Sequence, residues 1–168
     1  MNDREFNRER RKQRRLHQIG TNTPRCSCGE TDWRCFEATS MPHCANCQIK
    51  TGPAKGERSR QRRLKELGTD RPVCAMCGET DWRCIEAHHV AGRKRDPTIV
   101  LLCANDHLRM TDDQLDHPLS TEADDQLLDK IGHFLLGLAD MLRLIAERLV
   151  EFGHNLIARA QISDPTPF

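Results

Sequence analysis

The C-terminal third of the chain carries the most regular hydrophobic pattern. Apolar residues recur there at alternating steps of three and four positions, at Leu128, Ile131, Leu135, Leu138, Leu142, Ile145, Leu149, Phe152 and Leu156. This spacing places them along one stripe of a helix and is typical of the a and d positions of a coiled coil. Charged residues interrupt the segment, which excludes a membrane span. The pattern predicts an amphipathic helical tail over residues 120–162.

The tail has a predicted start and two predicted weak points. Thr121-Glu122-Ala123-Asp124 resembles a capping box, which is typical of a helix N-terminus. Gly132 and Gly137 lower the helix propensity, so any bend of the helix is expected there.

The apolar stripe of the tail must be buried against something, and two arrangements achieve this. The tail could pair with the tail of a second copy and make a homodimer, or it could fold back over its own chain. The rest of the chain offers little apolar surface to cover the stripe, which favours the homodimer.

A shorter pattern precedes the tail. Trp82 to Ile85 predicts a short strand that leads into Glu86, and Thr98–Leu102 predicts a second strand of β-branched and apolar residues. Cys103 to Thr111 reads as the start of a helix. The order strand, loop, strand, helix predicts an α+β unit. Only 37% of the chain is apolar and 30% is charged, which favours small zinc-stabilised units over one large core.

The front of the chain contains an internal duplication. Residues 9–38 align with residues 57–87 once one residue is inserted inside the second cysteine pair, and 20 of the 30 residues of the first copy are identical. Each copy has a basic helical run, a Gly-Thr step, a proline and a cysteine pair, so both descend from one duplicated unit. After the shared Glu-Ala, the second copy continues with His88-His89 and the first with Thr39-Ser40. We therefore expect two related units, at residues 1–56 and 57–119, before the tail.

The chain contains nine cysteines, and their spacing indicates that these units bind metal ions. The N-terminal stretch is charged throughout and does not match a signal peptide, so we expect a cytoplasmic, reducing location in which close cysteine pairs are metal ligands. In the first copy, Cys26, Cys28, Cys44 and Cys47 predict a structural zinc site. A decayed site is the alternative, and His43 could replace one ligand.

Residues outside these motifs receive ordinary structural roles. Cys35 and Cys84 occur in both copies as Asp-Trp-Arg-Cys and are expected as small core residues, with Trp33 and Trp82 as core anchors. The histidines without a surrounding motif are expected at the surface: His17, His117, His133 and His154.

The stretch Val73–Asp113 combines three motifs in order. The Cys74–Cys77 pair comes first, the step Glu86-Ala87-His88-His89 follows, and a Leu-Leu-Cys-x-x-x-His cluster ends it with Cys103 and His107. This order resembles the cysteine-containing branch of the HNH nuclease family, and the resemblance covers about a quarter of the chain. It implies a ββα-metal fold in the second copy, with structural zinc on Cys74, Cys77 and Cys103. By the duplication, it also implies a related ββα-like zinc-ribbon unit in the degenerate first copy, which follows a basic arm. Asp106 stands where the family has a fourth cysteine, so Asp106 or a water is expected as the fourth ligand.

The resemblance also implies catalytic roles. His88 and His107 would bind a catalytic divalent ion (Mg, Mn or Zn), and His89 would be the general base in phosphodiester hydrolysis. The Asn of the family name is missing, since Arg95 or Thr98 stands near its place, and Thr111 occupies a further ligand position of some members. The alternative function is therefore a non-catalytic, zinc-dependent nucleic-acid-binding protein derived from such a nuclease.

Charge distribution favours DNA as the partner. The net charge is only +1, but residues 1–68 hold twice as many Lys and Arg as Asp and Glu, whereas acidic residues dominate residues 111–168. Arginines in such runs hold phosphates without reading sequence. The predicted DNA-binding residues are Arg10, Arg11, Arg14, Arg15, Arg58, Arg60, Arg62, Arg63, Arg93, Lys94 and Arg95.

Overall fold

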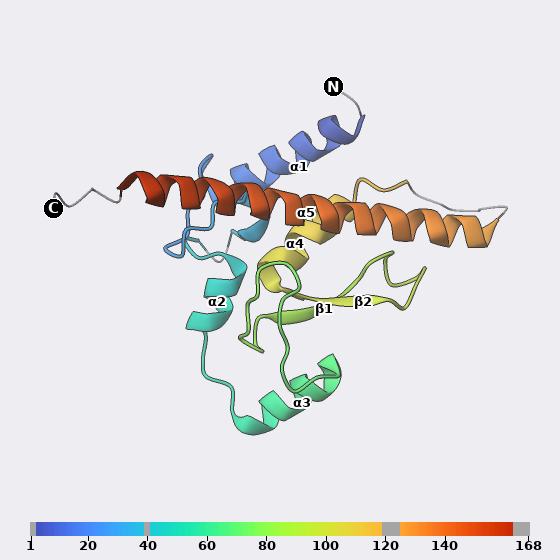
Figure 1. The fold of residues 1–168 in the computed structure, drawn as a ribbon, viewed down its shortest axis with the longest axis horizontal. Helices are drawn as coiled ribbons and strands as arrows, with labels where there is room; N and C mark the ends of the chain where they lie inside the picture. The colour runs from blue at the N-terminus through green and yellow to red at the C-terminus, as the bar shows by residue number, and fades with distance from the viewer. Residues whose placement is uncertain (1–2, 39–40, 119–124, 163–168) are drawn as a thin grey trace.

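A computed structural model describes residues 3–38, 41–118 and 125–162. Within these ranges the predicted α+β class is confirmed: helices accompany one two-stranded antiparallel sheet, and a long helix ends the described chain (Figure 1). The elements in chain order are α1 (Asp3–Ile19), η1 (Trp33–Cys35), α2 (Ala45–Thr51), α3 (Glu57–Leu67), β1 (Ile85–His89), β2 (Ile99–Cys103), α4 (Ala104–Gln114) and α5 (Gln126–Ile162).

The second strand and the helix after it form where the sequence pattern predicts them. β1 and β2 pair with Ile85 opposite Cys103 and His89 opposite Ile99, and α4 begins directly after Cys103. The first strand starts later than expected, because Trp82 lies in the turn before β1. The strand therefore runs through both histidines of the His88-His89 pair.

The expected second ββα unit is not found in the first copy. Its described residues contain η1 and α2 but no strand. Eight residues separate Cys35 from Cys44, against eighteen between Cys84 and Cys103. The first copy thus lacks the length for two strands and a loop, and it retains only the cysteine turn and the short helix.

Each copy has its own small core around its cysteines. The cluster in the first copy contains Leu16, Ile19, Cys26, Cys35, Phe36 and Cys44, and the other contains Leu67, Cys74, Ile85, Leu102, Cys103, Met110 and Leu144. Cys35 and Cys84 are fully buried, as predicted. Trp33 is half-buried and packs against the first cluster, as predicted, whereas Trp82 is half-buried and belongs to neither cluster. Phe36 and Ile85, which follow Cys35 and Cys84, are fully buried.

The tail forms one uninterrupted helix that crosses the whole molecule (Figure 1). The side chain of Asp125 accepts hydrogen bonds from the backbone N–H groups of Leu127 and Leu128 at 2.9 and 3.0 Å and so caps the helix. The predicted capping box lies outside the described residues. Gly137 has a specific reason to be glycine, because a Cβ there would lie 1.8 Å from the carbonyl oxygen of Val90. Within the described ranges, no helix is both long enough and apolar enough to cross a membrane.

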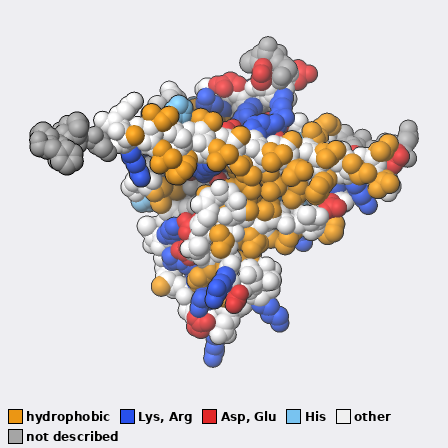
Figure 2. Space-filling model, in the orientation of Figure 1, with side chains coloured by type: hydrophobic (Ala, Val, Ile, Leu, Met, Phe, Trp, Pro, Cys, Tyr) orange, Lys and Arg blue, Asp and Glu red, His pale blue; other side chains and the backbone are white. Residues whose placement is uncertain are grey.

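Two faces of α5 behave differently. One face contacts the chain through His133, Gly137, Asp140 and Leu144, which are all buried. The predicted a and d stripe lies elsewhere on the helix and faces solvent, with Leu135, Leu142 and Leu149 exposed at 56, 58 and 65%. Figure 2 shows a band of hydrophobic side chains along α5. The tail therefore does fold back on its own chain, but it does so without covering its stripe.

The prediction that His117 and His133 are surface residues is wrong. Their side chains are 8 and 6% exposed, and Nε2 of His117 lies 2.6 Å from Oδ2 of the buried Asp140. Burial alone would raise the pKa of Asp140, but hydrogen bonds from His117 and Arg143 outweigh burial and lower it. These polar contacts fix α5 against the end of α4, which the sequence pattern did not indicate. His17 and His154 are exposed, as predicted.

Candidate functional site

The first candidate metal centre brings together the four cysteines predicted from the sequence. The Sγ atoms of Cys26, Cys28, Cys44 and Cys47 all lie within 4.8 Å of one another, and those of Cys28 and Cys44 are 3.6 Å apart. Zn–S bonds of about 2.3 Å in a tetrahedron require sulfur atoms about 3.8 Å apart, so the group fits such an ion. Burial would raise the pKa of Cys26, but backbone hydrogen bonds at Cys28 and Cys44 outweigh burial and lower it to about 6.

The second candidate metal centre contains three thiols and one carboxylate. Ligand atoms of Cys74, Cys77, Cys103 and Asp106 also lie within 4.8 Å of one another. Oδ2 of Asp106 is 3.3 Å from Sγ of Cys74 and 3.4 Å from Sγ of Cys103. Hydrogen bonds from the thiols of Cys103 and Cys77 lower the pKa of Cys74 to about 3. Both predicted ligand groups are thus confirmed as groups that could hold a metal ion such as zinc.

Two arginines hold the other oxygen of Asp106. Oδ1 accepts hydrogen bonds from Arg109 at 2.7 Å and from Arg148 of α5 at 3.1 Å, and the carboxylate is fully buried. Outer contacts of this kind orient a ligating carboxylate. They also offset the excess negative charge that three thiolates and a carboxylate would leave around a divalent ion. The aspartate is therefore built into the centre by α4 and α5 together.

The two centres touch through matching contacts. The N–H of Asn46 donates to Oδ1 of Asn105 at 3.0 Å, and the N–H of Asn105 donates to Oδ1 of Asn46 at 3.3 Å. In the same way, the thiol of Cys35 donates to the carbonyl of Asn105, and that of Cys84 donates to the carbonyl of Asn46. Such exchange of equivalent contacts is the signature of a two-fold interface, here between the copies of one chain.

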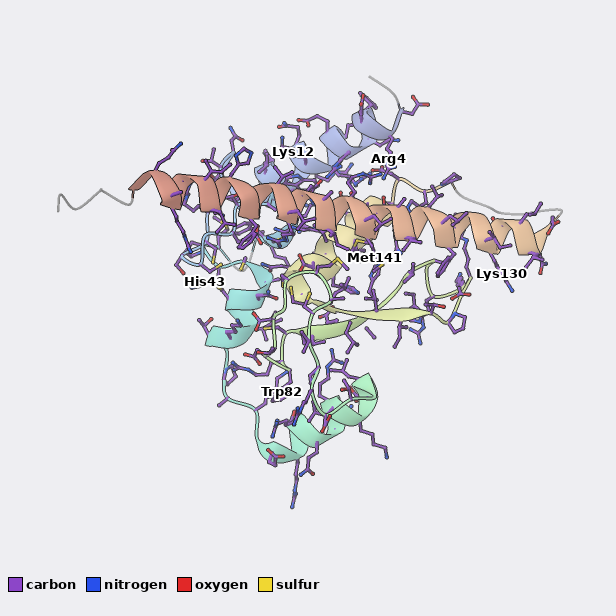
Figure 3. All side chains as sticks on the ribbon, viewed as in Figure 1. Arg4, Lys12, His43, Trp82, Lys130 and Met141 are labelled. Carbon is purple, nitrogen blue, oxygen red and sulfur yellow. The ribbon has the colours of Figure 1, made fainter. Side chains whose placement is uncertain are left out.

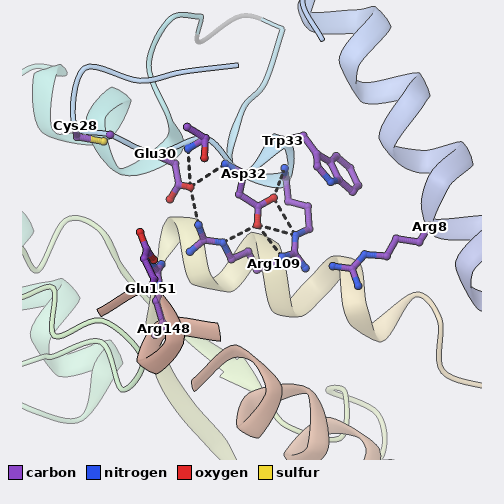
Figure 4. Close-up of a pocket in the computed structure, with 11 residues that line it drawn as sticks. Arg8, Cys28, Glu30, Asp32, Trp33, Arg109, Arg148 and Glu151 are labelled. Carbon is purple, nitrogen blue, oxygen red and sulfur yellow. Dashed lines mark hydrogen bonds and ion pairs between the residues drawn. The ribbon is translucent and has the colours of Figure 1, made fainter. Parts of the chain in front are cut away.

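A polar cavity of about 600 Å³ opens where the copies meet (Figure 4). Arg109 crosses it and donates to Oδ2 of Asp32 at 3.0 Å and to Oε1 of Glu30 at 2.6 Å. Arg34 pairs with Asp32 and with Asp113. The cavity lining thus balances arginines against acids, and none of the three predicted catalytic histidines lies in it.

The predicted catalytic histidines lie at the hairpin and on α4. The rings of His88 and His107 meet edge to face with centroids 5.0 Å apart. Nε2 of His88 is buried and has no hydrogen-bond partner in the described part of the chain. Burial, reinforced by the nearby His107 and His89, lowers the pKa of His88 to about 4, so the ring is neutral and can act as a ligand.

Glu86 is part of this histidine group. Its Oε2 lies 3.2 Å from Nδ1 of His107, and its place two residues before His88 puts both on one face of β1. Glu86 was not among the predicted site residues, although its position two residues before His88 on a strand indicates a shared face. His89 belongs to the other face of β1, is half-buried, and its carbonyl accepts a hydrogen bond from Gln114 at 2.9 Å.

The predicted DNA-binding arginines of α1 have unequal surroundings. Arg11 donates to Oδ1 of Asp112 and to Oδ1 of Asp116, both at 2.8 Å, so its guanidinium is engaged within the protein. Arg10 and Arg14 are exposed and Arg15 is half-exposed, and none of them has an ion pair with another described residue.

The other basic residues lie on α3 and on the loop between the strands. Arg58, Arg60 and Arg62 are exposed, whereas Arg63 donates to the carbonyl of Ile85 at 2.6 Å. In the loop, Arg93 and Lys94 are exposed, and Nε of Arg95 lies 3.6 Å from Asp129 of α5.

Comparison with known proteins identifies no relative, since no family model, curated protein or solved structure matches the chain.

Proposed function

We propose that this protein is a metal-dependent endonuclease that hydrolyses phosphodiester bonds of DNA at His88, His89 and His107. The observation that carries the proposal is the buried Nε2 atom of His88, which has no hydrogen-bond partner in the described residues and sits beside the ring of His107. A buried polar atom without a partner is costly, and a role as metal ligand accounts for it.

Each residue of the group then has a definite task. His88 and His107 would hold a divalent ion, which supplies a Lewis acid for the phosphoryl oxygen when bound. Oε2 of Glu86 lies 3.2 Å from Nδ1 of His107, so Glu86 would orient the imidazole and leave Nε2 of His107 as the atom that holds the ion. His89 takes the proton of the attacking water, a role that suits an imidazole near neutral pH.

The two cysteine-rich centres are proposed as structural zinc sites. Thiolates select zinc over harder ions, and the oxygen of Asp106 completes a tetrahedral set in the second centre. Neither centre has an open position for substrate, because all four ligands come from the protein. Their task is to hold β1, β2 and α4 in the arrangement that brings the histidines together.

DNA is proposed as the substrate because exposed arginines and lysines lie on three segments of the chain. They occupy α1, α3 and the loop between the strands, and they would contact phosphates rather than bases. Arg11, Arg63 and Arg95 are exceptions. Arg11 pairs with Asp112 and Asp116, Arg63 donates to the carbonyl of Ile85, and Arg95 lies beside Asp129.

A homodimer through α5 is proposed because the a and d stripe remains exposed along the helix. Exposed apolar surface of this extent marks an interaction site, and a seam with steps of three and four fits a second copy of itself. The positions beside the seam are small at every seventh residue, at Gly132, Ala139, Ala146 and Gly153, which allows a close approach of the partner helix.

One observation favours the alternative, a zinc-dependent nucleic-acid-binding protein without catalysis. The histidine group offers two imidazoles, and its carboxylate, Glu86, is turned towards His107. The loop between the strands contains no asparagine. In that case the basic surfaces and the structural zinc sites would remain, and cleavage would be absent.

A plasmid nicking assay separates the two functions. Supercoiled plasmid is incubated with the full chain and added Mg, Mn or Zn, beside the His89→Ala variant and the control His154→Ala, which changes an exposed histidine of α5. We expect wild type and control to nick, and His89→Ala to be slower by ~10²–10⁴-fold. Equal rates in all three proteins would remove His89 from catalysis. Plasmid retention without nicking in any protein would support the alternative.

A further inference from the structure

A groove of about 380 Å³ lies between α3 and the turn that leads into β1. Its walls come from Arg62 and Arg63 of α3, Lys55 of the preceding linker, and Trp82 and Arg83 of the turn. Figure 3 shows Trp82 close to α3, below the hairpin. Neither the metal centres nor the proposed catalytic roles use these side chains.

The groove is positively charged. Lys55, Arg62, Arg63 and Arg83 line it, against two carboxylates, Glu66 and Glu86. Nε of Arg62 pairs with Oε1 of Glu66 at 3.0 Å, although the Arg62 side chain is 83% exposed, and Lys55 is exposed without an ion pair to any described residue. Figure 2 shows Lys and Arg side chains gathered over α3 at the tip of the molecule. Such a surface attracts an anionic ligand.

Backbone contacts hold two of these cations in place. Arg63 donates to the carbonyl of Ile85 at 2.6 Å, and Arg83 donates to the carbonyl of Lys50 at 3.4 Å. These contacts join α3, α2 and β1 around the groove. The guanidinium groups are therefore positioned before a ligand arrives.

Trp82 adds an aromatic surface beside the cations. The indole is half-buried and is one of only two tryptophans in the chain. Cations that follow a phosphate backbone together with an aromatic ring for a base are the combination that binds single-stranded nucleic acid. A base inside a duplex could not reach the ring, because it is already stacked between its neighbours.

Glu86 connects the groove to the histidine group. It lines the groove, and its Oε2 lies 3.2 Å from Nδ1 of His107. We propose that the groove binds an unpaired segment of a DNA strand, with a base on Trp82 and phosphates on Lys55 and Arg62. The next phosphodiester would then lie towards His107. This inference rests on the proposed nuclease function for its direction but not for binding itself.

The duplication supplies a matched control for Trp82. Trp33 is the equivalent of Trp82, and Arg14 is the equivalent of Arg62. The first copy cannot form the same groove, because Arg34, the equivalent of Arg83, is buried between Asp32 and Asp113.

The test is tryptophan fluorescence of the full, zinc-loaded chain in titrations with an eight-nucleotide oligothymidylate. The His89→Ala background removes cleavage, and Trp33→Phe makes Trp82 the only reporter. We expect saturable quenching of Trp82, with binding weakened about tenfold or more by Lys55→Gln with Arg62→Gln, and hardly changed by Lys130→Gln, which changes an exposed lysine of α5. Inorganic phosphate alone should not quench, and zinc content checks the fold of every variant.

The outcomes separate this inference from the nuclease proposal. If Trp82 is not quenched, or if Trp33 is quenched equally in a Trp82→Phe chain, the groove is not the binding site, even if the wild type nicks plasmid. Quenching by duplex DNA as strong as by the oligothymidylate would overturn the unpaired-strand assignment. Quenching of Trp82 with the expected losses would establish the groove even if the wild type proves unable to cut.

Discussion

Asn46 and Asn105 exchange hydrogen bonds, each donating its backbone N–H to the side-chain oxygen of the other. Each follows a metal-centre cysteine by two residues, within the shared triplet Cys-Ala-Asn. Nδ2 of Asn105 also donates to Sγ of Cys44 at 3.4 Å, so the helix that supplies Asp106 to one centre supports a ligand of the other. The two centres are therefore expected to stabilise each other.

Asn105→Ala should weaken both the fold and the first centre. It removes the contacts to Cys44 and Asn46 and leaves a buried N–H of Asn46 without a partner, at a cost of about 1–3 kcal/mol. Urea unfolding of the zinc-loaded protein measures the loss, and a chelator competition measures zinc retention. Asn22→Ala, at an exposed position, is the control. Unchanged unfolding and zinc retention in Asn105→Ala would show that the centres are independent.

Zinc content should be about two ions per chain, because each group contributes four ligands to a tetrahedral site. Cys47→Ser should reduce it towards one, and Asp106→Ala should do the same for the second centre. Metal analysis after purification without chelator gives the ratio, and Cys35→Ala serves as the control since that thiol is buried outside both groups. Two ions in the Cys47→Ser protein would place the first ion elsewhere.

The hairpin, α4 and both cysteine groups could be predicted from the sequence because local pattern and ligand spacing determine them. The pairing of the copies could not be predicted, since it depends on contacts between Asn46 and Asn105 across a long stretch of chain. One signal was available: Cys-Ala-Asn-Cys in the first copy matches Cys-Ala-Asn-Asp in the second. This match extends the duplication beyond the segment where the two sequences diverge, and it aligns Asp106 with the ligand Cys47.

Charged side chains were harder to place than apolar ones. A run of arginines has the same sequence pattern whether each side chain faces solvent or an acid, and Arg11 finds Asp112 and Asp116 about 100 residues away in sequence. His117 is buried for the same reason, because Asp140 of α5 is its partner. Such pairings depend on how α1, α4 and α5 pack, which periodicity does not specify.

Arg14→Gln should therefore change DNA binding but not stability, and Arg11→Gln should change stability but not DNA binding. Loss of exposed Arg14 should reduce the slope of log affinity for DNA against log salt by about 0.9 if it contacts one phosphate, with stability unchanged. Loss of Arg11 should leave the slope unchanged and reduce the free energy of unfolding by on the order of 1–3 kcal/mol, because its partners are acids of the same chain. Binding titrations at several salt concentrations and urea unfolding measure the two quantities. A lower slope in Arg11→Gln would mean that DNA displaces its internal partners.

The two glycines of α5 provide a matched pair of substitutions. Gly137→Ala would push a methyl group against the carbonyl of Val90 and should destabilise the protein by on the order of 1–3 kcal/mol. Gly132→Ala meets no atom within 4 Å and should stabilise the helix by up to about 1 kcal/mol. The free energy of unfolding of both variants, measured in urea against wild type, tests these expectations. A neutral Gly137→Ala would show that α5 does not dock against Val90 in solution.

The exposed stripe of α5 should make the protein a dimer. Removing the whole tail is a poor test, because α5 also supplies Leu144 to a core and Arg148 to Asp106. The triple variant with glutamate at Leu135, Leu142 and Leu149 is a sharper test. All three side chains are exposed in the single chain, so replacing them leaves the packing within that chain intact.

Val150→Glu is the control for these changes, because Val150 is equally exposed but lies off the stripe. Light scattering should give a dimer for wild type and control and a monomer for the triple variant, with zinc content unchanged in all three. A wild-type monomer would mean that the stripe serves another partner. A dimer that survives the three glutamates would locate the contact between copies on a different face, since three buried carboxylates cannot be accommodated along an apolar seam.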